Sequence, residues 1–131
     1  MYSPIAKDQN HLISPYLTEL PGFTPPLNLA VMASGNGSNF EALYKAIKSN
    51  KLNAFISVLV VNNKDCGAKA RADRLGIKSV LHDHRSFNSR QDLDAQLVKT
   101  FRDNEVELVV MAGWMRVVSS ILIKAYPDAL I

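Results

Sequence analysis

Residues 28–44 read NLAVMASGNGSNFEALY, an apolar run followed by a glycine loop and a helical pattern. The apolar run is typical of a strand buried in a sheet. Ser38 is followed three residues later by Glu41, the spacing of a capping box, which predicts that a helix begins there. Apolar side chains then recur at helical spacing, at Phe40, Leu43, Tyr44 and Ile47. The stretch therefore predicts a strand, a tight loop and a helix in succession.

The same alternation continues along the chain. Further strands are expected at about residues 55–62, 77–81 and 106–112, and their near-continuous Val/Ile-rich character is typical of strands buried on both faces. Further helices are expected at about 66–75, from near Ser89, and at about 120–126. This order predicts an α/β fold, a Rossmann-like open and mostly parallel sheet with helices on both faces. The last residues, 128–131, have the pattern of an entry into another strand.

Residues 1–27 differ in composition from the rest of the chain. Prolines at positions 4, 15, 21, 25 and 26 exclude a regular helix or a central strand there. We therefore expect an irregular Pro-rich extension over residues 1–27 and one domain over residues 28–131.

Composition excludes several classes of protein. Hydrophobic residues make up 47% and charged residues 21%, as in ordinary globular proteins. The longest apolar run, residues 55–61, is interrupted by Ser57 and is too short to cross a bilayer, so no membrane partner is expected. The net charge of +3 comes without a dense Lys/Arg cluster, which argues against nucleic-acid binding. The single Cys66 can form neither a disulfide framework nor a structural zinc site, and a cytoplasmic location is expected.

The glycine loop has the chemistry of an anion site. Its two glycines let a ligand approach the backbone, and the following helix presents unpaired N–H groups. Phosphate binding is therefore expected, with Gly37, Ser38 and Asn39 as donors. A tight turn without a ligand is the alternative. A dinucleotide fingerprint would need glycine in place of Phe40 and an acidic residue in place of Asn62, and a Walker A loop would need a lysine.

A second candidate segment, residues 111–118 (MAGWMRVV), follows the fourth expected strand at the same edge of the sheet. Trp114 and Met115 offer apolar surface to an aromatic ligand, although packing into the core is the more common use of such side chains at a strand end. Arg90 and Arg116 could pair with ligand carboxylates. His82 and His84 could share a metal ion, but no third ligand with suitable spacing is evident, so no metal site is expected.

The two motifs VMASGNGSNF (residues 31–40) and VVMAGWMR (residues 109–116) together resemble the phosphoribosylglycinamide formyltransferase family. The resemblance covers about residues 28–131 and includes NNK after the second strand and FNSR before the third helix. It implies formyl transfer from 10-formyltetrahydrofolate to the amine of glycinamide ribonucleotide in de novo purine synthesis, without a metal.

The resemblance also implies roles for particular residues. The ribonucleotide phosphate would bind Gly37, Ser38 and Asn39, in agreement with the chemistry of the loop. The cofactor-binding residues would be those of the pterin pocket together with one arginine of the folate site: Met115, Arg116, Val117, Val118 and Arg90.

The family's catalytic residues have no counterpart in this sequence. The resemblance places an Asn-x-His element and a later Asp after Ile131, and neither His11, His82 nor His84 matches that histidine. We therefore expect an N-terminal, phosphate-binding portion of a formyltransferase domain, inactive alone. A noncatalytic sugar-phosphate-binding module and an NAD-type dinucleotide-binding domain are the alternatives.

Overall fold

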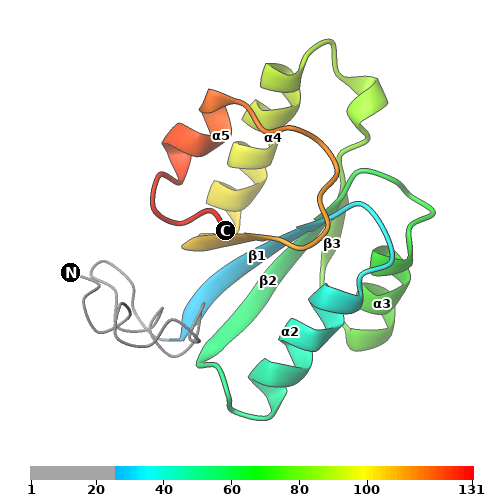
Figure 1. Cartoon of the computed structure of the whole chain (residues 1–131), viewed down its shortest axis with the longest axis vertical. Coiled ribbons are helices and arrows are strands. Elements are labelled where there is room, and N and C mark those ends of the chain that lie inside the picture. Colours follow the sequence, from blue (N-terminus) through cyan, green and yellow to red (C-terminus); the bar gives the residue numbers. More distant parts are fainter. Residues whose placement is uncertain (1–25) are drawn as a thin grey trace.

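The computed structural model describes residues 26–131 (Figure 1). The expected extension over residues 1–27 lies outside the described residues, apart from Pro26 and Leu27. Leu27 is fully buried and is the first residue of β1 (Leu27–Ala33), so the sheet begins one residue before the expected boundary.

Four parallel strands form the sheet, in the order β3-β2-β1-β4. The other three strands are β2 (Ala54–Val61), β3 (Ser79–Leu81) and β4 (Leu108–Met111). The prediction of an α/β fold with a parallel sheet is confirmed. The third strand is shorter than expected because Ile77 still belongs to the preceding helix end, where its N–H donates to the carbonyl of Ala72 at 2.9 Å.

Helices cover both faces of the sheet (Figure 1). On one face lie α2 (Ser38–Lys48) and α3 (Gly67–Leu75), and on the other lie α4 (Arg90–Asp103) and α5 (Ser120–Ala125). A short 3-10 helix, η2 (His84–Ser86), connects β3 to α4. None of the described helices is long and apolar enough to cross a membrane.

The central strand β1 contributes side chains to both cores. Leu29 and Met32 pack in the core beneath α4 and α5, together with Phe101. Val31 packs in the smaller core beneath α2 and α3, together with Phe40. Burial on both faces is the reason that this strand is continuously apolar in the sequence.

The strand order brings two strand ends together. From β1 the chain builds outward through β2 and β3, then returns to place β4 on the other side of β1. The carboxyl ends of β1 and β4 are therefore neighbours at the point where the strand order reverses, and open α/β sheets bind ligands at such points. Two backbone bonds join the segments there: Ser34 N donates to Gly113 O at 3.0 Å, and Ala112 N donates to Met32 O at 2.8 Å.

The residues just before Ile131 run beside β4, on the side away from β1. Leu130 forms a parallel bridge with Val109, and the carbonyl of Ala129 accepts from Val109 N at 2.8 Å. The expected entry into a further strand is confirmed by this pairing.

Candidate functional site

The glycine loop between β1 and α2 ends in a left-handed residue, Gly37, with φ 85° and ψ 13°. The carbonyl of Gly37 accepts the first backbone bond of α2, from Glu41 N at 2.9 Å. Within the described part of the chain, the N–H groups of Ser38, Asn39 and Phe40 have no hydrogen-bond acceptor. Free donors at a helix N-terminus attract an anion, because the helix dipole adds partial positive charge there.

The predicted capping box is wrong. No side chain caps α2, and Ser38 is the first helical residue instead of the cap. Glu41 turns toward α3, where its carboxylate accepts from Arg71 at 2.7 Å and also from Arg74. These two guanidinium groups lower the pKa of Glu41 to about 2. Charged hydrogen bonds from two arginines outcompete a single bond to the helix backbone.

Phe40 argues against the dinucleotide alternative. Its side chain is fully buried in the core beneath α2 and α3. In a dinucleotide fingerprint, glycine at this position lets the helix approach the strand closely. Here a large ring fills that space.

Helix α3 packs closely against the glycine loop. The N–H of Ala68 donates to the carbonyl of Gly35 at 3.0 Å. A Cβ on Gly37 would lie 2.6 Å from the Cα of Ala68, and a Cβ on Gly67 would lie 2.8 Å from the carbonyl oxygen of Asn36. Glycine is therefore required sterically at both positions, which the sequence did not indicate for Gly67.

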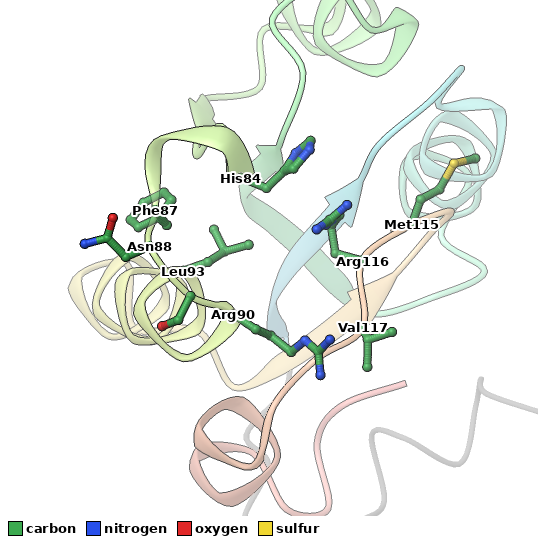
Figure 2. Close-up of a pocket in the computed structure, with 9 residues that line it drawn as sticks. His84, Phe87, Asn88, Arg90, Leu93, Met115, Arg116 and Val117 are labelled. Carbon is green, nitrogen blue, oxygen red and sulfur yellow. The ribbon is translucent and has the colours of Figure 1, made fainter.

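A cavity of about 390 Å³ opens beside the end of β4 (Figure 2). One wall comes from η2 and the start of α4, and the other from the segment after β4. The lining residues are His84, Phe87, Asn88, Ser89, Arg90, Leu93, Met115, Arg116 and Val117. Four residues expected in a folate site, Arg90, Met115, Arg116 and Val117, thus lie around one cavity.

The cavity combines apolar surface with positive charge. Met115 and Val117 are 77% and 66% exposed, so neither is part of the core of the described residues. The lining contains two arginines and no carboxylate. Neither Arg90 nor Arg116 forms an ion pair with any residue from 26 to 131. This charge favours an anionic ligand.

The glycine loop and the cavity meet at Met115. The N–H of Met115 donates to Ser34 Oγ at 2.9 Å, and its side-chain Cε lies 3.9 Å from where a Cβ on Gly35 would be. A ligand bound at the loop and a ligand bound in the cavity would therefore be neighbours.

Two residues of the second motif lie outside the lining of this cavity. Trp114 and Val118 are half-buried and pack against the larger core, and neither lines the cavity. Core packing, the alternative use of Trp114, is the one the structure favours. The indole Nε1 of Trp114 is buried without a hydrogen-bond partner among the described residues.

The wall built by residues 84–89 was not expected from the sequence. Asp83 precedes this wall and caps η2, because its carboxylate accepts a hydrogen bond from the N–H of Arg85 at 3.0 Å. His84 lies on the cavity with its Nδ1 buried and unpaired in the described structure.

His82 does not line the cavity. Its Nε2 lies 2.7 Å from Thr100 Oγ1, and burial lowers its pKa. Across residues 26–131, no group of three or more His, Cys, Asp or Glu side chains could hold a metal ion.

Comparisons with known proteins identify the family of the chain. A family model described as "Formyl transferase" matches residues 27–131. The chain is 33% identical over 102 residues to the phosphoribosylglycinamide formyltransferase of Bacillus subtilis, covering 78% of this chain and 52% of that protein. It is 31% identical over 105 residues to the enzyme of the same name from Escherichia coli, covering 80% of this chain and 50% of that protein.

Solved structures give the same result. A glycinamide ribonucleotide transformylase from Symbiobacterium toebii has a TM-score of 0.77 and 27% identity, covering 79% of this chain and 49% of that one. The phosphoribosylglycinamide formyltransferase from Coxiella burnetii has a TM-score of 0.76 and 31% identity, covering 80% and 49%. The chain thus spans about half the length of these two structures and of the two sequence relatives above. It belongs to the formyl transferase family.

Proposed function

We propose that this chain forms the ligand-binding half of an enzyme that transfers a formyl group from 10-formyltetrahydrofolate to the amine of glycinamide ribonucleotide in de novo purine synthesis. The observation that carries the proposal is the contact at Met115 between a glycine loop that precedes free N–H donors and a cavity lined by two arginines. A transfer reaction needs two substrates held side by side, because positioning removes much of the entropic barrier. The proposal includes a cytoplasmic location, which the lone Cys66 favours.

The ribonucleotide phosphate is proposed to bind Gly37, Ser38 and Asn39. Ser38 and Asn39 are exposed at the start of α2, and their N–H groups have no acceptor among the described residues. Gly37 is buried and lies close to α3, and its N–H has no acceptor among the described residues. The glycinamide amine would then extend from the loop toward Met115.

The chemistry of the cavity lining supports the proposal that a folate binds there. Its apolar side chains, Phe87, Leu93, Met115 and Val117, suit a flat heterocycle. Arg90 and Arg116 suit the carboxylates of a glutamate tail, because a guanidinium binds a carboxylate through two parallel hydrogen bonds. When bound, 10-formyltetrahydrofolate supplies the formyl carbon that the amine attacks.

Binding without efficient turnover is the expected behaviour of residues 1–131 alone. By the family resemblance, the donor that orients the oxyanion and the group that carries protons have no counterpart in this sequence. Removing an oxyanion donor alone slows such reactions by about 10²–10³-fold. Normal turnover by this chain in a coupled assay would contradict the proposal.

The cavity is tested by titrating tetrahydrofolate into the wild-type chain and into the variants Arg90→Ala and Arg116→Ala. Each variant should bind about tenfold more weakly, because each removes a charged hydrogen-bonding partner of the tail. Arg102→Ala is the matched control, since Arg102 is an exposed arginine on the same helix as Arg90 but does not line the cavity. Equal losses in all three variants would show that net charge, and not this cavity, determines binding.

A further inference from the structure

One side chain of α3, Arg71, forms hydrogen bonds with the glycine loop between β1 and α2. Its Nε donates to the carbonyl oxygen of Asn36 at 2.9 Å, and its Nη2 donates to Asn36 Oδ1 at 2.8 Å. The guanidinium therefore fixes both the main chain and the side chain of the same loop residue. Arg71 is not one of the residues expected to touch a ligand.

The contact with the carbonyl of Asn36 sets the direction of the next N–H group. Because a trans peptide is planar, the carbonyl of Asn36 and the N–H of Gly37 point in opposite directions. The carbonyl faces Arg71 and α3, so the N–H of Gly37 faces away from α3. This N–H has no acceptor within residues 26–131. It lies next to the free donors of Ser38 and Asn39, which begin α2.

Arg71 is held between Asn36 of the loop and the carboxylate of Glu41. Its Nη1 donates to Glu41 Oε1 at 2.7 Å, and the Glu41 side chain is only 11% exposed. Glu41 also binds Arg74 and lies 3.6 Å from the ammonium of Lys45. Three cations surround this carboxylate, so it remains charged at any pH near neutrality. The guanidinium of Arg71 thus connects the carboxylate of Glu41 to Asn36 in the loop.

The backbone of α3 supports the same loop peptide. The Cα of Gly67 lies so close to the carbonyl oxygen of Asn36 that an added Cβ would stand 2.8 Å from it. This close approach leaves the carbonyl little room to turn away from Arg71. The loop peptide is therefore oriented before any ligand arrives.

We propose that Arg71 is a positioning residue for phosphate binding, which acts through Asn36 by directing the N–H of Gly37 into the anion site. The inference rests on the proposed function of the loop. Arg71 does not itself need to touch the phosphate. Preorganised donors bind more tightly than donors that must be ordered on binding.

The test is calorimetric titration of ribose 5-phosphate into the full chain and three variants. Arg71→Ala should weaken binding about tenfold, and Arg71→Lys should recover little of it, because an ammonium lacks the fork that grips both oxygens of Asn36. Arg74→Ala is the matched control, since Arg74 shares the carboxylate of Glu41 but does not contact Asn36. It should stay within about twofold of the wild-type chain. The amide resonance of Gly37 should shift in Arg71→Ala and not in Arg74→Ala.

Each outcome decides a separate point. An absence of ribose 5-phosphate binding in the wild-type chain would overturn the phosphate site and this inference with it. Wild-type binding that is unchanged in Arg71→Ala would overturn the inference alone. Full recovery in Arg71→Lys, or an equal loss in Arg74→Ala, would show that charge acts at a distance and not through Asn36. Arg71→Lys keeps the charge and the aliphatic stem, so it provides this test even where Arg71→Ala fails to fold.

Discussion

Replacing Gly37 by alanine tests the packing of the glycine loop against α3 directly. Gly37 has φ 85°, in the left-handed region that side chains disfavour. An alanine Cβ would stand 2.6 Å from the Cα and 2.8 Å from the Cβ of Ala68, distances that force α3 or the loop to move. The substitution therefore combines a backbone penalty with a steric one.

The two penalties have separable magnitudes. A left-handed alanine costs roughly 1–2 kcal/mol. Overpacking against a fixed neighbour costs about another 1–3 kcal/mol. Gly76 provides the control for the first penalty, because it has φ 75° and nothing within 4 Å of an added Cβ. We expect Gly37→Ala to lower the free energy of unfolding by roughly 2–5 kcal/mol and Gly76→Ala by only about 1–2 kcal/mol.

Equilibrium urea unfolding followed by far-UV circular dichroism measures both values. The dependence of the unfolding free energy on urea should stay the same in the two variants, so that the change in midpoint reports stability. Adding Ala68→Gly to Gly37→Ala should recover only part of the loss, because the contact with the Cα of Ala68 remains. Equal destabilisation in Gly37→Ala and Gly76→Ala would refute the reasoning, since it would mean that the loop moves away from α3 without a penalty.

Three further predictions concern charge and buried hydrogen bonds. In the folded chain the pKa of Glu41 is lowered from 4.5 to about 2, so its contribution to stability is complete above pH 4.5 and is lost as the pH falls toward 2. In a plot of melting temperature against pH, Glu41→Gln should therefore flatten the acid side. Burial lowers the pKa of His82 below 6.5, so His82 contributes stability above pH 6.5 that is lost on acidification. His82→Gln should therefore remove this fall in melting temperature below pH 6.5 from the same plot. Tyr126→Phe removes a buried bond of 3.1 Å to the carbonyl of Val106 and should cost about 1–3 kcal/mol in urea unfolding, while a loss below the error of the measurement would mean that water replaces the hydroxyl.

The sequence predicted the strands and helices better than it predicted which of them lie side by side in the fold. Periodicity and apolar runs identified the strands and the helices, because each of those signals lies within a dozen residues. The return of the chain across β1 to form β4 has no local signal, yet it is what places Met115 beside the glycine loop. The wall of the cavity was missed for a similar reason: His84 and Phe87 follow an edge strand of three residues, and their role depends on a segment about thirty positions later.

Resemblance and structure contribute differently to the candidate site. The resemblance selected Arg90, Met115, Arg116 and Val117, and the structure places all four on one cavity. Val118 was selected by the same motif but packs against the larger core. A motif matches consecutive residues, whereas the chain turns as it leaves β4, so successive side chains face different surroundings.

The absent helix cap at α2 has a functional consequence. A Ser/Thr cap with a glutamate three residues later satisfies two of the free donors at a helix start. With Ser38 as the cap, these would be the N–H groups of Ser38 and Glu41, so a capping box would occupy one donor of the proposed phosphate site, that of Ser38. In this chain the arginines of α3 hold Glu41 away from the helix backbone, and the N–H groups of Ser38, Asn39 and Phe40 stay free among the described residues. The helix begins at Ser38 with Gly37 as the cap, and Glu41 pairs with Arg71 and Arg74, so S-x-x-E at this position does not close the helix end.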